Sequence, residues 1–320
     1  MAKLAADVVA GDRRALARAI TLVESTKEND QKAAVSLLTA LLPRTGRSVR
    51  IGISGPPGVG KSTFIETFGQ HLSALKMRIA VFAIDPSSRR SGGSILGDKT
   101  RMERLARDPS AYIRPSPAGT TLGGVARRTR ESMLVAESAG FDVVLVETVG
   151  IGQSETAVAD MTDLFVVLVA PAGGDDLQGI KRGVMELADL LLVTKADGEL
   201  APVARRTEAD YRMAMYLMQP KHAGLPTKVA TVSARENVGI GESWLAISRL
   251  HSTLRSDGRL ARLREAQLRR WFWSEIQSVV SENILARPKL ATEARRYESE
   301  IVEGKTLPFV AARRLIADVF

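Results

Sequence analysis

The amino-acid sequence predicts an α/β fold in which helices cover both faces of a mostly parallel sheet, giving three layers. Short, continuous apolar runs alternate with segments of helical periodicity from residue 49 to about residue 255, as βαβ units require. The composition agrees, because 320 residues with 45% apolar and 25% charged side chains suit one large globular domain with appendages.

The chain divides into three predicted parts. Residues 1–48 have helical periodicity that stops near Pro43 and Gly46, and they predict a helical N-terminal extension. Residues 49–255 predict the α/β domain, with strands at 49–54, 79–84, 142–147, 164–169, 189–194 and 228–233 and helices at 62–75, 99–107, 124–139, 178–187 and 202–218.

Residues 256–320 predict a helical C-terminal arm, with a long amphipathic helix at 259–285 and two further helices at 291–303 and 308–319. The apolar stripe of the long helix needs a partner surface, either on the α/β domain or on the same helix of a second subunit. We favour a homodimerisation arm, because symmetric dimers are the commonest oligomers.

Composition excludes several classes of function. The absence of cysteine excludes disulfides, iron–sulfur clusters, Cys-ligated zinc and thiol catalysis, and three histidines argue against a transition-metal site. The net charge is +9, but the sequence has no continuous basic tract, so no nucleic-acid partner is expected. The longest apolar run, 164–172, is about half of the roughly 20 residues that a membrane span needs, and no signal-peptide pattern opens the chain, so we expect a cytoplasmic protein without membrane contact.

The segment 55–62 matches G-x-x-x-x-G-K-[ST] between a predicted strand and a predicted helix. Its glycines let successive backbone N–H groups point at phosphate oxygens, and the helix N-terminus adds partial positive charge. Lys61 is expected on the β- and γ-phosphates and the Ser62 hydroxyl on Mg²⁺. The motif predicts a nucleoside triphosphate but leaves the base open. The predicted nucleotide-binding residues here are Gly55, Pro56, Pro57, Gly58, Val59, Gly60, Lys61, Ser62 and Thr63.

Carboxylates follow two other predicted strands. Glu147 ends the strand 142–147, where P-loop enzymes hold Mg²⁺, and Gly150 is placed to give its N–H to the γ-phosphate, so the loop 148–155 should be a switch. Asp85 and Asp98 follow the strand 79–84 and could face the metal and the attacking water. Their alternatives are a turn aspartate before a proline and a helix N-cap, respectively.

The string Thr194-Lys195-Ala196-Asp197 ends the strand 189–194 and fits the [N/T]-K-x-D pattern of guanine recognition. A carboxylate at Asp197 accepts both the N1–H and the 2-amino hydrogens of guanine, which adenine does not offer as a pair. Ser233 and Ala234 follow the next strand and fit the loop that presents N–H to guanine O6. The sequence therefore favours GTP and GDP over adenine nucleotides.

The hydrolytic apparatus is less complete. Many GTPases place a water-orienting Gln directly after the switch glycine, but here Ile151 follows Gly150 and Gln153 comes three positions after that glycine. We expect slow intrinsic GTP hydrolysis that a protein partner stimulates, with Lys61, Asp85, Asp98 and Glu147 as the predicted catalytic residues.

Five strings carry a family resemblance: DPSS at 85–88, SGGSILGDKTRM at 91–102, RPSP at 114–117, TLGG at 121–124 and ETVGIGQSE at 147–155. Together with the P-loop they make the chain resemble, over nearly its whole length, the MeaB/ArgK-type GTPases associated with methylmalonyl-CoA mutase. Most relatives have Asn where this chain has Thr194, which only slightly weakens the guanine prediction.

The resemblance implies a GTP-hydrolysing chaperone that binds adenosylcobalamin-dependent methylmalonyl-CoA mutase, gates cofactor loading and protects the mutase from inactivation. It implies GTP/GDP and Mg²⁺ as cofactors, with Ser62, Asp85, Asp98 and Glu147 around the metal. It also implies the mutase as partner, an adenosyltransferase as a further candidate partner, and a homodimer through the arm. An additional switch is implied at Asp175, Asp176, Gln178 and Lys181, although the residues alone would suit an ordinary polar loop.

Three other functions stay open. An older assignment of the family is a kinase of an arginine/ornithine transport system. The client could instead be another cobalamin-dependent acyl-CoA mutase. A nucleic-acid-associated GTPase is the third alternative, which salt-sensitive duplex binding would reveal.

Overall fold

The structure is a computed structural model of the whole chain, and it describes all residues except 85–101, 116–121, 149–154, 172–181, 286 and 318–320. The chain forms two compact units, Met1–Glu265 and Ala266–Phe320. The first contains the sheet and the candidate site.

The first unit is built on a seven-stranded parallel sheet with the strand order β3-β2-β4-β1-β5-β6-β7. The predicted α/β class with a parallel sheet is thereby confirmed. Most strands are buried along their whole length, which explains why they are continuous apolar runs rather than alternating ones. The strands are β1 (Val49–Ser54), β2 (Ile79–Ile84), β3 (Ala111–Pro115), β4 (Val143–Thr148), β5 (Leu164–Val169), β6 (Leu190–Val193) and β7 (Lys228–Thr231).

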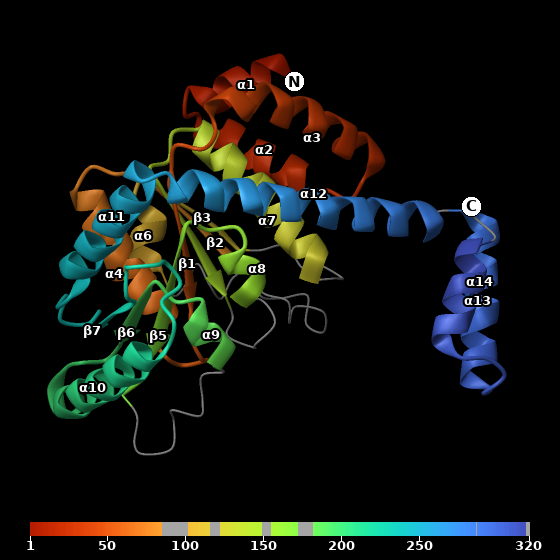
Figure 1. Cartoon of the computed structure of the whole chain (residues 1–320). Helices are drawn as coiled ribbons and strands as arrows, with labels where there is room; N and C mark the ends of the chain where they lie inside the picture. Colours follow the sequence, from red (N-terminus) through yellow and green to blue (C-terminus); the bar gives the residue numbers. More distant parts are fainter. Residues whose placement is uncertain (85–101, 116–121, 149–154, 172–181, 286, 318–320) are drawn as a thin grey trace. The chain divides into compact units, whose positions relative to one another are not determined.

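Helices cover both faces of this sheet (Figure 1). On one face the buried core joins the strands to α1 (Ala2–Val9), α2 (Arg13–Glu24), α3 (Glu28–Leu41), α7 (Leu122–Ser138), α8 (Glu155–Ala159), α9 (Arg182–Glu186) and α10 (Ala201–Leu217). On the other face a second core joins them to α4 (Lys61–Ala74), α6 (Glu103–Arg107) and α11 (Ile240–Ser256). The N-terminal helices are therefore part of the layer structure of the sheet, and the short 3₁₀ turn η1 (Leu42–Arg44) leads from them into β1.

The C-terminal helices are α12 (Arg259–Leu285), α13 (Pro288–Val302) and α14 (Pro308–Ala317). α12 begins in the first unit and continues in the second, where α13 and α14 pack against each other. Within the described part of the chain, no helix has the length and apolar character that crossing a bilayer requires.

Two elements of the sheet domain were not predicted, and two predicted strands are shorter than expected. Strand β3 was not predicted, because its five residues include Arg114 and end at Pro115, so they form no apolar run. Helix α11 was also not predicted, although its buried Ile240, Ile247 and Leu254 recur at helical spacing and could have revealed it. The strands predicted at 189–194 and 228–233 are shorter in the structure, because the pairing between β6 and β7 ends at Val193 and Thr231.

A buried ionic network fixes the amino ends of the central strands. The Asp163 carboxylate, directly before β5, accepts hydrogen bonds from the Arg50 backbone N–H at 2.9 Å and from Arg264 Nε and Nη2 at 2.8 and 2.7 Å. Burial alone would raise the pKa of Asp163, but the hydrogen bonds from Arg264, with His251 Nε2 3.5 Å from Oδ2, lower this pKa to about 2. Arg50 in turn forms a bidentate pair with Glu137 of α7. The start of α12 is thus joined to β1, β5 and α7.

Candidate functional site

The parallel pairing gathers the predicted site residues at the carboxyl edge of the sheet. Ile53 of β1 pairs with Glu147 of β4, and on the other side of β1 the strands β5 and β6 run in register up to Val169 and Val193. The loop 55–60, the end of β4 and the segment that follows β6 therefore all leave the sheet at the same edge, where parallel α/β folds bind ligands.

The loop after β1 has the conformation that its glycines predict. Gly58 and Gly60 have φ angles of 77° and 98°, a region that favours glycine, and Gly60 is the N-cap of α4. A Cβ at either position would meet no other atom of the described residues within 4 Å, so open space lies beside this backbone. Lys61 Nζ donates hydrogen bonds to the carbonyls of Gly55 at 2.7 Å and Pro56 at 3.1 Å. The ammonium group therefore lies over the loop that would hold phosphates.

Two oxygen-bearing side chains meet next to this loop. Ser62 Oγ, in the first turn of α4, donates a hydrogen bond to Glu147 Oε1 at 3.2 Å. Glu147 is 7% exposed, and the neighbouring Thr148 hydroxyl is bonded to Ser54 Oγ at 2.9 Å. A hydroxyl and a carboxylate beside a phosphate loop are the hard oxygen ligands that Mg²⁺ prefers, so the residues present fit this ion.

Thr194 connects the end of β6 to the phosphate loop. Its buried hydroxyl lies 2.7 Å from the carbonyl oxygen of Val59 and 3.1 Å from that of Val169. This contact satisfies a buried carbonyl of the loop and gives the threonine hydroxyl a structural role at the first position of the T-K-x-D string. Lys195, next in the chain, is exposed and has a positive φ of 54°.

Asp197 and Ser233 come together from two loops 36 residues apart. Ser233 Oγ donates to Asp197 Oδ2 at 2.5 Å, while the Glu236 backbone N–H donates to Ser233 Oγ at 3.0 Å. Ser233 is fully buried and Asp197 is partly exposed, so a buried hydroxyl fixes one oxygen of a carboxyl group that solvent still reaches. Ala234 lies in the same loop, and its carbonyl accepts a hydrogen bond from the Thr67 hydroxyl at 3.1 Å.

Sequence reasoning missed this role of Thr67. The side chain ties the Ser233 loop to α4, and thereby to the phosphate loop. Thr67 falls within the helix predicted at 62–75, but nothing in the sequence pointed to a partner 167 positions away.

Arg114, the first residue of the string RPSP at 114–117, pairs with the Glu24 carboxylate of α2 through Nε at 3.1 Å and through Nη2. Burial raises the pKa of Glu24 more than the hydrogen bonds from Arg114 lower it. This pair joins the end of β3 to the N-terminal helices.

Eight predicted site residues lie outside the described residues. They are the candidate metal or water ligands Asp85 and Asp98, the switch residues Gly150 and Gln153, and the additional switch Asp175, Asp176, Gln178 and Lys181. The geometry above therefore rests on the phosphate loop, Ser62, Glu147 and the two loops that carry Asp197 and Ser233.

Three features of the site are those of a P-loop nucleoside triphosphatase of the GTPase type. They are a strand–loop–helix beside open space, a carboxylate on the adjacent strand, and a T-K-x-D loop after β6. The chain belongs to the family described as "Methylmalonyl Co-A mutase-associated GTPase MeaB", whose family model matches residues 16–289.

Similar proteins agree with this family. The chain is 46% identical over 324 residues to the mouse protein "Methylmalonic aciduria type A homolog, mitochondrial", covering 98% of this chain and 78% of that one. It is 46% identical over 276 residues to "GTPase ArgK" of Escherichia coli, covering 86% and 83%. A solved structure titled "Crystal structure of LAO/AO transport system kinase" has a TM-score of 0.77 and 36% identity, covering 99% of this chain and 97% of that one.

Proposed function

We propose that this GTPase is a chaperone of an adenosylcobalamin-dependent methylmalonyl-CoA mutase, that it uses GTP to gate loading of the mutase cofactor, and that it protects the mutase from inactivation during turnover. The family match over residues 16–289 carries this proposal. An adenosyltransferase that supplies the cofactor is a further proposed partner.

The proposed nucleotide contacts follow from the site. The N–H groups of the loop 55–60 and of the first turn of α4 bind the phosphates, and Lys61 exchanges its loop carbonyls for the β- and γ-phosphate oxygens. Ser62 and Glu147 would hold Mg²⁺, which supplies positive charge against the charge that develops on the phosphates.

The proposed base contacts lie at the second end of the site. Asp197 accepts two hydrogen bonds from guanine while Ser233 keeps its carboxylate oriented. The exposed Lys195 lays its alkyl chain along the ring, and Ala234 offers its N–H to guanine O6. Adenine would leave the carboxylate without donors, and this loss disfavours ATP.

The proposed rate of hydrolysis is slow without a partner. No glutamine directly follows Gly150, so we propose that mutase contact brings Gln153 or another group of the switch loop to the attacking water. Asp85 and Asp98 are proposed to complete the surroundings of the metal and the attacking water. The segment with Asp175, Asp176, Gln178 and Lys181 is proposed to relay mutase contact.

We also propose a homodimer through α12. Leu268, Phe272 and Trp273 of this helix are 60%, 61% and 64% exposed, which is unusual for large apolar side chains so close together. Contact with the same helix of a second subunit would bury them. Sedimentation of the full chain tests this: Leu268→Glu should convert dimer to monomer, and a wild-type monomer at tens of micromolar would contradict the proposal.

The function is tested by measuring GTP turnover with and without a purified methylmalonyl-CoA mutase, together with co-elution of the two proteins. The expected result is a stable complex and turnover that rises at least tenfold. A related cobalamin-dependent mutase and an unrelated acyl-CoA enzyme serve as comparisons. Stimulation by the related mutase alone would transfer the proposal to that client, and neither stimulation nor co-elution with either mutase would refute it.

A transport-system kinase is the second candidate, because the similar solved structure bears that title. Terminally labelled GTP separates the two. Release of free phosphate indicates hydrolysis, whereas transfer of the label to a transport protein indicates a kinase.

A further inference from the structure

A cavity of about 410 Å³ lies at the amino-terminal ends of the strands, whereas the proposed nucleotide site lies at their carboxyl-terminal ends. Its lining includes Leu164, Leu190 and Lys228, which are the first residues of β5, β6 and β7, and one side of α11. In a parallel sheet all amino ends lie at one edge, whereas the phosphate loop, Glu147 and Thr194 follow carboxyl ends. The cavity is therefore separate from the proposed GTP site, and its volume is in the range of small-molecule pockets.

The walls of the cavity are mainly hydrocarbon. They are formed by aliphatic side chains of the strands, of α11 and of the loop before β7, among them Val166, Leu190, Leu225, Ile247 and Leu250. Such walls favour the apolar part of a ligand, because its burial releases water from both surfaces.

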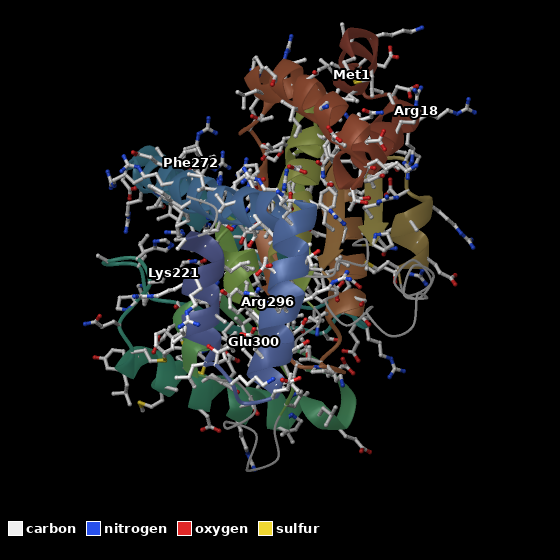
Figure 2. The ribbon with its side chains drawn as sticks, turned by 90° about the vertical axis from the view of Figure 1, so that its right-hand side faces the viewer. Met1, Arg18, Lys221, Phe272, Arg296 and Glu300 are labelled. Atoms are coloured by element: carbon white, nitrogen blue, oxygen red, sulfur yellow. The ribbon has the colours of Figure 1, made fainter. Side chains whose placement is uncertain are left out.

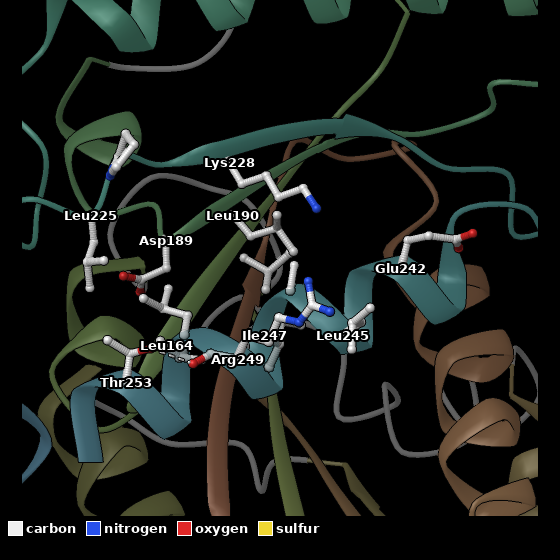
Figure 3. A pocket seen from close by; sticks show the side chains of 14 residues that line it. Leu164, Asp189, Leu190, Leu225, Lys228, Glu242, Leu245, Ile247, Arg249 and Thr253 are labelled. Atoms are coloured by element: carbon white, nitrogen blue, oxygen red, sulfur yellow. Dashed lines mark hydrogen bonds between the residues drawn. The ribbon is translucent and has the colours of Figure 1, made fainter. Parts of the chain in front are cut away.

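Two cations, Lys228 and Arg249, line the same cavity from opposite sides. Figure 3 shows Lys228 descending from β7 and the Arg249 guanidinium rising from α11. Both residues are exposed, and neither forms an ion pair with any residue that the structure describes. Two like charges that face one space repel each other, and an anion between them would replace this repulsion by attraction.

The acidic residues around the cavity do not provide that anion. Asp189 is buried, and its Oδ2 already accepts hydrogen bonds from the Phe165 backbone N–H at 2.7 Å and from Lys221 Nζ at 2.5 Å. Its Oδ1 lies 2.9 Å from His222 Nε2. Glu242 is two helical turns before Arg249, and Figure 3 shows it at the far end of the lining, directed away from Lys228.

We propose that this cavity binds a small amphipathic anion, with an aliphatic body against the apolar walls and a carboxylate or phosphate head between Lys228 and Arg249. The guanidinium fork suits the two oxygens of either head, and the ammonium adds a second charge. A volume of about 410 Å³ corresponds to about fourteen water-sized groups, at roughly 30 Å³ each. This size fits a chain of about six to ten carbons with its head.

Calorimetric titration of the full-length protein with octanoate and with octyl phosphate tests the proposal and separates the two head groups. Saturable binding of either one is expected, and binding of neither at about 10 mM would overturn the proposal. Octanol and inorganic phosphate, which lack the head and the body respectively, should bind at least tenfold more weakly. Equal binding of octanol would refute the role of the cations.

Variants then locate the binding. Arg249→Gln and Lys228→Gln should each weaken binding about tenfold or more, because each removes a charge-assisted contact. Arg255→Gln is the matched control, since it removes an exposed charge from the same helix outside the cavity lining. Equal affinity of the cavity variants and this control would overturn the assignment of the head group.

A second kind of variant tests the body of the ligand. Ala246→Phe places a ring in the cavity and should abolish binding, whereas GDP affinity should be unchanged, which shows that the fold is intact. Retained octanoate binding in Ala246→Phe would contradict the location. GDP binding is measured on the same samples, so failure of this proposal is distinguishable from failure of the nucleotide proposal.

Discussion

Replacement of Asp197 by asparagine should exchange the base that the site accepts. Ser233 Oγ donates to the Asp197 carboxylate at 2.5 Å. In Asp197→Asn the amide oxygen is the group that can keep this bond, so the NH₂ group turns towards the base. Guanine then presents two N–H donors to another donor, whereas xanthine presents a carbonyl oxygen at C2.

The size of the effect follows from the bonds that are lost. Each hydrogen bond to a charged group contributes about 1.5–3 kcal/mol, so loss of both costs about 3–6 kcal/mol. Asp197 is partly exposed, and water compensates part of this loss, which favours the lower half of the range. We therefore expect GDP affinity to fall by about 10²–10³-fold, since each 1.4 kcal/mol is a factor of ten.

The assay is competition of GDP and xanthosine diphosphate against a fluorescent guanine nucleotide for wild type, and against the matching xanthine nucleotide for the variant. The variant should bind xanthosine diphosphate at least tenfold better than wild type does. GDP affinity within threefold of wild type would refute the assigned contact. Loss of both nucleotides, with unchanged urea unfolding, would refute the proposed turn of the amide.

Three further predictions concern the supports of the site. Thr194→Val should leave the Val59 carbonyl unpaired and lower stability in urea by about 1–3 kcal/mol, whereas Thr194→Ser, which keeps the hydroxyl, should lose less; equal losses would contradict the hydrogen bond. Glu147→Gln should leave Mg²⁺-free GDP binding intact but raise the Mg²⁺ concentration needed for hydrolysis at least tenfold, and an unchanged requirement would exclude this carboxylate as a ligand. The pKa of Asp163 is lowered from 3.8 to about 2, so its pairing should contribute about 2 kcal/mol above pH 4 that is lost as the pH falls towards 2. Asp163→Asn should reduce the loss of stability between pH 4 and pH 2. It should also lower the free energy of unfolding at pH 7 by about 3–5 kcal/mol, because it leaves Arg264 buried without its anion. Urea unfolding curves at pH 7 and pH 3 that match those of wild type would contradict both effects.

Much of the fold follows from local patterns. The buried parallel strands are continuous apolar runs, and five of the six predicted strands both begin and end within one residue of the observed bounds. Strand β3 was missed because it lies at the sheet edge and contains polar residues, so it carries no such run. Pairing with β2 gives it strand structure, and pairing is a tertiary property.

The described part of the candidate site lies at contiguous sequence motifs, so its position at the strand ends could be predicted from the sequence. The strings 55–62 and 194–197 each bring their own backbone geometry, and the glycine φ angles of the phosphate loop follow from the motif. What the motifs did not predict are contacts between distant segments, such as Thr194 with Val59 or Thr67 with Ala234. These contacts depend on where the sheet register places each loop.

By itself the sequence determined the α/β class, the parallel sheet, the nucleotide motifs and the family, because each depends on residue type at short spacing. The tertiary structure alone decided the buried network around Asp163 and the cavity between β7 and α11 with its two facing cations. In the sequence, nothing distinguishes Lys228 and Arg249 from the other lysines and arginines. They become a candidate anion site only because an edge strand and the helix packed on it bring them to one space. The phosphate loop differs, because its motif already predicts a nucleotide ligand. There the tertiary structure adds only the side chains that support the loop, such as Thr194.

In Figure 2, the labelled Arg296 and Glu300 lie one turn apart on α13, where they form an ion pair at 3.5 Å. Such i, i+4 pairs are visible in the sequence, since their partners share one helix. A contact within one element can be predicted from spacing, whereas a contact between elements requires the fold.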